Sequence, residues 1–381
     1  MLSIFVKINI IALATFSSLG ICDELIKGLN ECNIHTPSDI QVKSIPYLLE
    51  KGHDFIGQAQ TGTGKTAAFG LPILQKINPE YPKIQALILC PTRELGQQIA
   101  KQLFKFTKFY HKIFVEAVYG GTPIDKQIST LRRPTHIVVA TPGRLIDLLD
   151  RKAIDITHIN TIVLDEADEM FSMGFKNDID TILAQTNGHR HTWLFSATIS
   201  EEIKIIIKRY MSKDALSVTI DKTSKVNKNI LHQYVECEEG EKDAMLFHFL
   251  RSQGEGRGII FCKTKSTAQT LAKQLVSKNY PADALHGDLM QLERDKVMRA
   301  FKNTKVQILV ATDMAARGID VDNLQYVLHY QLPEQIEYYT HRSGRTARAG
   351  NTGLSVSFVE KKEVAKIKEI EKLLAIRIIK L

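Results

Sequence analysis

The sequence predicts an α/β fold with two tandem domains, each a mainly parallel sheet flanked by helices. At 381 residues the chain is long for one domain, since single domains mostly hold ~100–200 residues. Short apolar, β-rich segments alternate along it with helical segments, the order that produces parallel strands joined by crossover helices. Many of these apolar segments end in a polar turn that contains Gly or Thr. Because ligands of such sheets bind at the carboxyl ends of the strands, these turns are the candidate sites.

The strand-forming segments define two series, and a polar stretch separates them. The first series is expected at 86–90, 136–140, 161–164 and 192–195, and the second at 258–262 and 306–311. Between these strands, helices are expected at 94–106 and 267–278. Residues 212–229 are polar and poor in strand formers, so we expect a linker there. The expected division is an N-terminal extension at 1–14, a first domain at 15–211, the linker at 212–229 and a second domain at 230–381.

Charge and cysteine content restrict the class of protein. Lys and Arg number 50 against 42 Asp and Glu, a net charge of +8 that suits a polyanion such as nucleic acid without establishing one. The five cysteines are scattered, with no CxxC pair. This argues against a zinc site or a disulfide scaffold and for a reducing compartment.

The segment AQTGTGKT, residues 59–66, is the first with a definite chemistry. A Gly-rich turn between a strand and a helix points backbone N–H groups at phosphate oxygens, and the helix N-terminus adds a favourable dipole. Lys65 is expected to reach the β- and γ-phosphates of a nucleotide, and the Thr66 hydroxyl to bind Mg²⁺. Strict P-loops begin with Gly where this chain has Ala59, so a Gly-rich turn without a ligand is the alternative. The predicted nucleotide contacts in this turn are Thr61, Gly62, Thr63, Gly64, Lys65 and Thr66.

Residues 165–168, DEAD, strengthen the nucleotide-binding interpretation. They follow the apolar segment 161–164, where P-loop NTPases place an acidic residue that binds Mg²⁺ directly or through water. Asp165 is expected in that role, and the adjacent Glu166 can orient and deprotonate the attacking water. The alternative is a solvated acidic strand end, but acidic residues in this order after a P-loop favour an ATPase or GTPase.

Further motifs establish a family resemblance. In chain order they are TPSDIQ (36–41), AQTGTGKT, PTREL (91–95), Gly120–Gly121, TPGR (141–144), DEAD, SAT (196–198), IIFC (259–262), QLER (291–294), ATDMAARGID (311–320) and HRSGRTAR (341–348). Over roughly residues 15–381 the chain resembles the DEAD-box ATP-dependent RNA helicases of superfamily 2. The resemblance implies two tandem RecA-like domains, with ATP and RNA both bound across the cleft between them. We recognise no further RNA-binding module after the last motif, so a minimal helicase core is expected.

The resemblance also implies roles in ATP hydrolysis for residues of both domains. Arg345 and Arg348 resemble arginine fingers for the γ-phosphate, and they share one face if their segment is helical. Asp320 resembles the residue that meets the ribose. Ser343 and Ala347 replace the commoner Ile and Gly of the last motif, and neither change removes a catalytic group. Coupling between the DEAD segment and domain movement is implied for Asp168, Ser196, Thr198 and His341.

RNA contacts in this family come from backbone and small polar groups more than from base edges. Such contacts hold phosphates and sugars, so they give affinity without sequence preference. Hydroxyl contacts can favour RNA over DNA. Mapped onto this sequence, the contacts are Pro91, Thr92, Arg93, Gly121, Thr141 and Arg144 in the first domain and Thr264, Arg294, Thr312 and Gly318 in the second. The single tryptophan, Trp193, precedes the SAT motif inside an apolar segment and is expected in the core.

The N-terminus invites a different interpretation, because Lys7 followed by an apolar run resembles a weak export signal. By family resemblance, however, Phe16 stacks on adenine and Gln41 binds the polar edge of the adenine ring, within a glutamine motif at 16–41. Cleavage or membrane insertion near residue 16 would remove that contact, and ATP is a cytosolic substrate. We therefore expect residues 1–14 to be a non-conforming extension, and a genuine signal peptide is the alternative.

The chain ends in a final strand at 353–359 and a basic helix at 361–374. Val364, Ile367, Ile370 and Leu374 recur on one face of that helix, which is expected to pack on the second domain.

The leading functional prediction is a cytoplasmic, monomeric RNA-dependent ATPase that separates short duplexes or strips proteins from RNA. The predicted cofactors are ATP and Mg²⁺. The predicted partners are RNA and ribonucleoprotein or ribosome-assembly proteins, with no membrane. Two alternatives stay open: an ATP-locked RNA clamp with little turnover, and a DNA-directed translocase.

Overall fold

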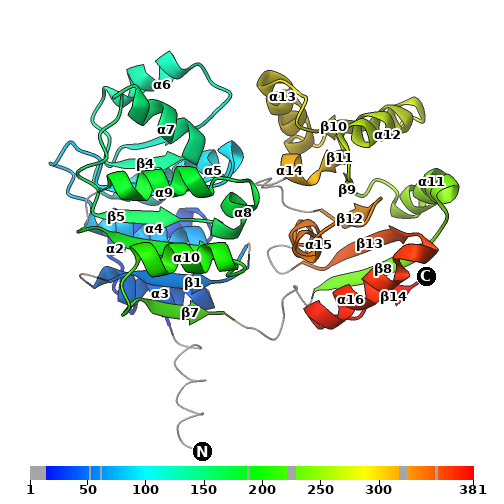
Figure 1. Cartoon of the computed structure of the whole chain (residues 1–381), viewed down its shortest axis with the longest axis horizontal. Coiled ribbons are helices and arrows are strands. Elements are labelled where there is room, and N and C mark those ends of the chain that lie inside the picture. The colour runs from blue at the N-terminus through cyan, green and yellow to red at the C-terminus, as the bar shows by residue number, and fades with distance from the viewer. Residues whose placement is uncertain are drawn as a thin grey trace, which may run out of the picture. The chain divides into compact units, whose positions relative to one another are not determined.

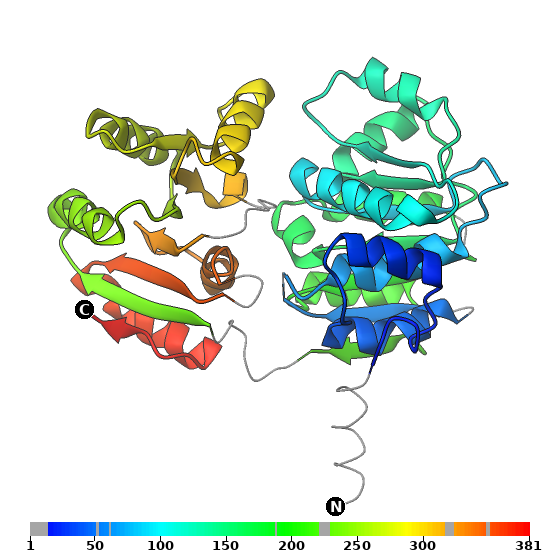
Figure 2. The same ribbon diagram turned by 180° about the vertical axis from the view of Figure 1, so that it is seen from behind.

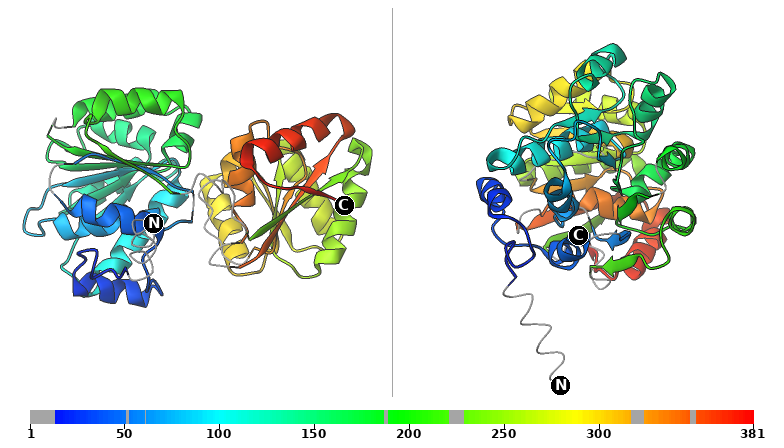
Figure 3. Two further views of the ribbon diagram at one scale, coloured as in Figure 1. Left: turned by 90° about the horizontal axis from the view of Figure 1, so that it is seen from below. Right: turned by 90° about the vertical axis from the view of Figure 1, so that its left-hand side faces the viewer.

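The computed structural model describes residues 14–50, 53–60, 62–186, 189–220, 229–316, 324–347 and 351–381. The chain divides into two units, Met1–Ile220 and Asp221–Leu381. Each unit contains one seven-stranded sheet, and every neighbouring pair of strands in either sheet runs parallel. Helices lie on both faces of each sheet (Figures 1 and 3). The predicted α/β class with two tandem domains is therefore confirmed.

The first unit has the strand order β3-β4-β2-β5-β6-β1-β7. Its predicted strands form close to their expected bounds, and the expected segment at 161–164 is β5 without any shift. The helical segment expected at 94–106 is α5. The strands are β1 (Phe55–Gln58), β2 (Ala86–Leu89), β3 (Val115–Val118), β4 (Ile137–Ala140), β5 (Thr161–Leu164), β6 (His191–Ser196) and β7 (Leu216–Thr219). The helices are α2 (Asp23–Glu31), α3 (Asp39–Leu49), α4 (Lys65–Lys76), α5 (Arg93–Phe106), α6 (Ile124–Leu131), α7 (Pro142–Asp150), α8 (Ala167–Ser172), α9 (Lys176–Gln185) and α10 (Glu201–Tyr210), with a 3₁₀ turn, η1, at Thr107–Phe109.

Alternate residues of the central strands enter two separate hydrophobic clusters, one on each face of the first sheet. On β2, Ile88 belongs to the cluster with Trp193 and Phe195, whereas Leu87 and Leu89 belong to the other. Helices α2 to α5 cover the first cluster, and α7 to α10 cover the second. Figure 1 shows α9 and α10 on the near face, and Figure 2 shows the dark blue α2 and cyan α5 on the other. Burial on both faces explains why these strands are continuously apolar, and Trp193, at 1% exposed, is in the core as predicted.

Residues 216–219 correct the expected linker. They form β7, an edge strand that pairs with β1, so this part of 212–229 belongs to the first sheet. Asp54, just before β1, explains how the segment is held: its carboxylate accepts hydrogen bonds from the backbone N–H groups of Thr192 (2.6 Å) and Ser212 (2.6 Å). Only one side chain of β7, Val218, is buried, and this is why a sequence scan for apolar segments overlooks the strand. The rest of the expected linker, 221–228, lies outside the described residues.

The second unit has the strand order β10-β11-β9-β12-β13-β8-β14. The segments expected at 258–262 and 353–359 are β9 and β13 without any shift, and the segment expected at 306–311 is β11, two residues later at its start. The strands are β8 (Ile230–Glu236), β9 (Gly258–Cys262), β10 (Ala282–Leu285), β11 (Ile308–Thr312), β12 (Tyr326–His329), β13 (Gly353–Val359) and β14 (Ile379–Lys380). The helices are α11 (Lys242–Gln253), α12 (Lys265–Ser277), α13 (Gln291–Lys302), α14 (Asp313–Ala316), α15 (Ile336–Ser343) and α16 (Val364–Leu374), with 3₁₀ turns η2 (Glu239–Glu241) and η3 (Lys361–Glu363).

The basic C-terminal helix packs on the second unit as expected. Ile367, Ile370 and Leu374 of α16 are buried in a cluster with Tyr339 and Val359, and Val364 is partly buried against the same cluster. Throughout the described ranges, no helix combines the length and the apolar character needed to cross a membrane.

The double acceptor role of Asp54 generates a stability prediction. Asp54→Ala leaves two backbone N–H groups without acceptors, and that of Thr192 is buried, where an unsatisfied donor costs ~1–3 kcal/mol. We expect the first unit to unfold at lower urea concentration, with the fluorescence of Trp193, the only tryptophan of the chain, as the probe. Asp214→Ala is the matched control, because Asp214 is exposed in the same region. An Asp54→Ala midpoint equal to that of Asp214→Ala would contradict this role.

Candidate functional site

The P-loop connects β1 to α4 at the carboxyl edge of the first sheet. Gly62 and Gly64 have φ values of +79° and +88°, a left-handed conformation that side chains disfavour. The Lys65 ammonium is buried and donates to the carbonyl oxygen of Ala59 (3.0 Å), so it lies across the loop that precedes it. Thr66 follows in the first turn of α4. Thr61 lies outside the described residues.

The glutamine motif is bonded directly to this loop. Gln41 is 4% exposed, and its amide accepts from the backbone N–H of Ser38 (2.9 Å) and donates to the carbonyl oxygen of Gly64 (2.9 Å). The Ser38 hydroxyl donates to the carbonyl oxygen of Thr63 (2.7 Å). Motif-based reasoning missed Ser38, although the spacing Ser38-x-x-Gln41 is that of a capping box, which α3 indeed has at its start. Gln41 therefore holds the P-loop backbone, using the same amide atoms that we expected to contact adenine.

The DEAD segment begins where β5 ends, beside the P-loop. Asp165 is 2% exposed, and its carboxylate accepts from the backbone N–H of Glu166 (3.0 Å). Burial raises the pKa of Asp165 to about 7, although the nearby Lys65 cation opposes this effect. Glu166 adopts a left-handed conformation (φ 50°, ψ 50°) immediately before α8. A strained residue of this kind persists only where its surroundings hold it.

Asp168 bonds to the SAT motif, which follows β6. Its carboxylate accepts from the backbone N–H (2.8 Å) and the hydroxyl (3.0 Å) of Thr198. The Ser196 hydroxyl accepts from the backbone N–H of Asp168 (3.1 Å) and donates to the carbonyl oxygen of Thr198 (2.7 Å). The backbone N–H of Ala59 donates to the carbonyl oxygen of Ser196 (2.9 Å). The structure thus joins the P-loop, DEAD and SAT turns by direct hydrogen bonds.

The RNA-contact candidates of the first unit follow β2, β3 and β4, which are neighbours in the sheet. The Thr92 side chain caps α5 by accepting from the backbone N–H of Leu95, and Arg93 stacks on the ring of Tyr119 at 4.8 Å. Arg144 donates to the carbonyl oxygen of Thr122 (3.0 Å) and to the Gln127 side chain (2.8 Å). Pro91 precedes Thr92, Gly121 has a φ of +77°, and Thr141 immediately precedes α7. Arg144 therefore fixes the turn that contains Gly121, and sequence analysis missed its partners Thr122 and Gln127.

Two candidates of the second unit, Thr264 and Thr312, occupy comparable strand ends, and Arg294 lies in the first turn of α13. Thr264 caps α12 after β9, Thr312 ends β11, and Arg294 donates to the carbonyl oxygen of Ala315 (3.4 Å). Gly318, Asp320 and Arg348 lie outside the described residues.

The last motif is not helical throughout, which corrects one expectation. Helix α15 includes His341 but ends at Ser343, and Arg345 lies in the turn that follows. Arg345 is 8% exposed, and its Nε donates to the carbonyl oxygen of His341 (3.2 Å). The condition for a shared helix face with Arg348 is therefore not met, because Gly344 caps the helix before Arg345. Ala347 has a φ of +56°, a conformation in which the commoner Gly is less strained.

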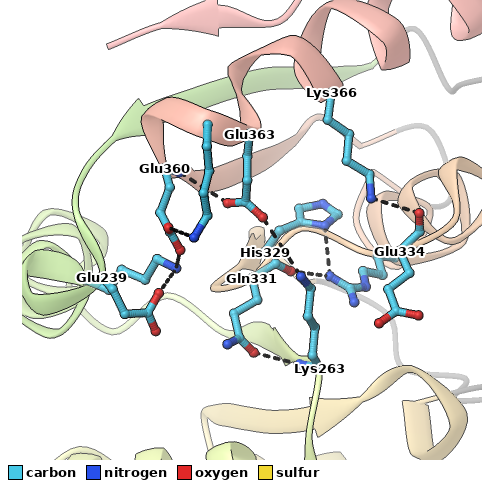
Figure 4. A network of polar contacts seen from close by, with 11 residues as sticks. Glu239, Lys263, His329, Gln331, Glu334, Glu360, Glu363 and Lys366 are labelled. Carbon is cyan, nitrogen blue, oxygen red and sulfur yellow. Dashed lines mark hydrogen bonds and ion pairs between the residues drawn. The ribbon is translucent and has the colours of Figure 1, made fainter.

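A buried polar network supports this turn, and motif-based reasoning missed it. Arg342 pairs with Asp313 (Nη2–Oδ2 2.7 Å) and donates to the carbonyl oxygen of Gln331 (2.7 Å). Fully buried His329 contacts the hydroxyls of Ser343 (3.3 Å) and Ser355 (3.2 Å). Burial and the Arg342 cation hold the pKa of His329 well below its ordinary value. Figure 4 shows His329 and Gln331 near Lys263 and Glu363. Ser343, which replaces the commoner Ile of the motif, belongs to this network through its contact with His329.

Comparisons with known proteins decide the family. A model of the DEAD/DEAH box helicase family matches residues 38–206, and one of the helicase conserved C-terminal domain matches residues 241–350. An ATP-dependent RNA helicase CshA of Limosilactobacillus reuteri is 44% identical over 96% of this chain and 73% of its own. The DEAD-box ATP-dependent RNA helicase CshA of Bacillus subtilis is 41% identical over 94% of this chain and 72% of its own. The chain belongs to the DEAD-box ATP-dependent RNA helicases.

Solved structures agree with this family assignment. Dbp5 of S. cerevisiae, bound to RNA and ADP BeF3, matches with a TM-score of 0.89 and 32% identity over 96% of this chain and 95% of that one. Mss116p bound to ssRNA and AMP-PNP matches with a TM-score of 0.88 and 31% identity over 97% of this chain and 80% of that one. The fold class is therefore that of tandem RecA-like domains, and the helicase is an ATP-hydrolysing enzyme that acts on RNA.

Phe16 lies in a different environment from the one expected of an adenine platform. Its ring is 3% exposed and belongs to the hydrophobic cluster that also contains Leu19 and Ile21. The backbone N–H of Ile21 donates to the carbonyl oxygen of Phe16 (3.1 Å), which closes a turn before α2. In the described structure Phe16 packs against protein, and its stacking on adenine stays a prediction.

The bond between Gln41 and the P-loop predicts a selective defect in nucleotide binding. Gln41→Glu keeps an acceptor for Ser38 but cannot donate to Gly64, and it places two oxygens against each other. Loss of a buried hydrogen bond worth ~1–3 kcal/mol predicts a Michaelis constant for ATP raised roughly 5- to 150-fold. Steady-state phosphate release measures it.

Gln75→Glu is the matched control, because Gln75 also joins two backbone groups, the N–H of Cys22 and the carbonyl of Gly20, away from the P-loop. Equal Michaelis constants for the two variants would rule out a specific role for Gln41 in holding the P-loop.

Proposed function

We propose that the helicase hydrolyses ATP in an RNA-dependent manner and uses hydrolysis to separate short duplexes or to strip proteins from RNA. The observation that supports this most is the bonded group of P-loop, DEAD and SAT turns around the buried Asp165. Such a group can transmit the state of the nucleotide to the rest of the unit, because a shift of any one turn strains its hydrogen bonds to the others.

Mg²⁺ fits the residues at this edge. Asp165 is a buried carboxylate, and burial of a negative charge is unfavourable unless a cation compensates for it. The Lys65 cation lies near enough to lower the pKa of Asp165, yet burial outweighs it. We propose that Asp165 and the Thr66 hydroxyl hold Mg²⁺ together with the nucleotide phosphates. When bound, the ion would neutralise charge that develops on the phosphate oxygens.

Within this arrangement we assign the remaining roles in the first unit by position. Glu166 is the general base, since its left-handed backbone directs its side chain differently from that of the adjacent Asp165. The N–H groups of Gly62 to Thr66 bind the phosphates, and Lys65 leaves the carbonyl of Ala59 to reach them. Asp168, Ser196 and Thr198 couple the nucleotide to domain movement. Gln41 and Phe16 are the proposed adenine contacts.

The second unit is proposed to complete the site when the two units close on ATP and RNA. Arg345 and Arg348 then supply guanidinium groups to the γ-phosphate, Asp320 meets the ribose, and His341 takes part in coupling. Guanidinium groups suit this role because they remain charged and bind phosphate with two parallel hydrogen bonds. Domain bounds at 15–211 and 230–381 remain part of this proposal, with the first extended to include β7.

RNA is proposed to bind through its sugar–phosphate backbone, without sequence preference. The proposed contacts are Pro91, Thr92, Arg93, Gly121, Thr141, Arg144, Thr264, Arg294, Thr312 and Gly318. Several of them lie at helix N-termini, as Thr92 and Thr264 do, where backbone N–H groups favour phosphate. We further propose that the protein is cytoplasmic, because its nucleotide substrate is cytosolic. The proposal also includes a monomeric state and ribonucleoprotein or ribosome-assembly partners.

Glu166→Gln tests whether the protein turns over ATP or acts only as an ATP-locked clamp. The amide keeps the size of the side chain but cannot accept a proton from water. We expect phosphate release to fall strongly, and the variant to remain on labelled RNA in a long-lived complex while ATP is present. Glu201→Gln is the control, because Glu201 is exposed and pairs only with Lys204 among the described contacts. Release of RNA by Glu166→Gln at the parent's rate would refute the assignment of the base.

Arg345→Lys tests the proposed arginine finger. Lysine retains the charge but not the planar fork, so we expect the Michaelis constant for ATP to change little and turnover to fall on the order of 10³-fold. RNA-stimulated phosphate release measures both quantities. The control is Arg251→Lys on the exposed side of α11. Turnover of Arg345→Lys within twofold of this control, roughly the scatter expected of a neutral surface change, would remove Arg345 from the mechanism.

A further inference from the structure

The first unit has a second concave site, at the sheet edge opposite the P-loop. A cavity of about 410 Å³ is lined by segments that precede three neighbouring strands: Lys83 before β2, Arg132 and Arg133 before β4, and Lys152 and Asp155 before β5. The P-loop, DEAD and SAT turns instead follow the carboxyl ends of their strands. Because all these strands are parallel, at least four residues long and rise ~3.3 Å per residue, the two sites lie roughly 13 Å or more apart.

The cavity is strongly basic. Lys83, Arg132, Arg133 and Lys152 are all exposed at its rim, and within the described chain segments none of their side chains forms an ion pair with a carboxylate. The lining contains one carboxylate, Asp155, which already accepts from the backbone N–H (3.0 Å) and hydroxyl (2.7 Å) of Thr157. The patch also affects Glu116 of β3. The Arg133 cation lowers the pKa of Glu116, although burial has the larger effect and raises it. Positive charge therefore predominates around the cavity.

Lys152 adopts a left-handed backbone conformation at the end of α7. Lys152 has a φ of +53° and closes α7, with its own N–H bonded to the carbonyl of Leu149 (2.8 Å) and that of Ala153 to the carbonyl of Leu148 (2.9 Å). Glycine is the usual residue at this position of a helix C-terminus, because a side chain is strained there. A lysine here accepts that strain and places its ammonium at the rim of the cavity.

Two rings adjoin the basic rim. Tyr81 is 39% exposed, and its hydroxyl contacts Nδ1 of His158 at 2.9 Å. The two rings meet edge to face, with centroids 5.8 Å apart. Exposed aromatic rings beside cations are the combination that binds single-stranded nucleic acid, because bases stack on the rings while the cations hold phosphates.

We propose that this cavity, with Lys83, Arg132, Arg133 and Lys152 at its rim and Tyr81 beside it, binds the phosphate backbone of a single RNA strand as a second site. Adjacent guanidinium groups suit phosphate oxygens, and 410 Å³ is enough for a nucleotide-sized group. The enzyme already acts on RNA. A strand bound at the carboxyl edge would therefore hold its remaining length near the second site at a high effective concentration. The second site would add affinity for long RNA without entering the ATP-hydrolysing machinery.

The test compares the full chain with Arg132→Glu/Arg133→Glu and with a control, Lys273→Glu/Lys278→Glu, that makes the same charge change on exposed residues of the second unit. Fluorescence anisotropy measures the binding of a short and a long oligouridylate over a series of salt concentrations. We expect the first variant to bind the long RNA at least roughly tenfold more weakly, since each lost charge-assisted contact is worth about that factor. The slope of log affinity against log salt should fall by about 1.4, at about 0.7 per phosphate contact.

Affinity for the short RNA and its maximal stimulation of phosphate release should equal those of the control. This arm separates the second site from the proposed catalytic function, whose failure would instead abolish RNA stimulation in all three proteins. Ultraviolet crosslinking of the long RNA should also label the peptide that contains Tyr81. Long-RNA affinity and salt slope equal to those of the control would overturn the proposal. Displacement of long RNA by polyglutamate as readily as by polyuridylate would overturn the assignment to RNA in favour of an acidic peptide.

Discussion

The parallel direction of every strand in the first sheet brings the P-loop, the DEAD segment and the SAT motif to one edge. These three turns are separated by long stretches of sequence, yet β1, β5 and β6 lie side by side. Parallel strands require helical crossovers, so each turn begins or precedes a helix and exposes backbone N–H groups there. This edge is therefore suited to phosphate, and the same constraint sends the segments before the strands to the opposite edge, where the basic cavity lies.

Hydrogen bonds between these turns convert proximity into a connected structure. Asp168 bonds to Thr198, Ser196 bonds to Asp168, and Ala59 of the P-loop bonds to Ser196. Gln41 and Ser38 extend the connection to α3 by bonding to the P-loop carbonyls. Each of these hydrogen bonds makes a net contribution of only ~1 kcal/mol. In a buried network, however, a displacement of one group strains its hydrogen bonds to the others. We propose that a nucleotide that moves the P-loop acts on the SAT motif through these contacts.

Much of the fold could be predicted because buried parallel strands are apolar along their whole length. Segments such as 161–164 and 258–262 matched their strands to the residue for this reason. β7 escaped prediction because, as an edge strand, it buries only Val218. Motif chemistry predicted a nucleotide site, but it could not show that the amide of Gln41 is bonded within the protein, that Phe16 is buried, or that α15 ends before Arg345.

Other features are invisible to sequence reasoning because they depend on tertiary contacts between distant segments. The polar network around His329 joins α15 to β12 and β13, and the basic cavity combines short segments before β2, β4 and β5. The cations of that cavity resemble ordinary surface residues until the fold places them around one concavity. In the glutamine motif, by contrast, the capping-box spacing of Ser38 and Gln41 was a usable signal for the start of α3.

We propose that RNA binding makes this bonded group of turns competent for hydrolysis. Steady-state phosphate release at saturating ATP, measured while RNA is titrated into the full chain, tests it most directly. We expect slow release without RNA and a strong, saturable rise as RNA binds, with no comparable rise when single-stranded DNA of the same sequence replaces it. Equal rates of phosphate release with and without RNA would contradict it.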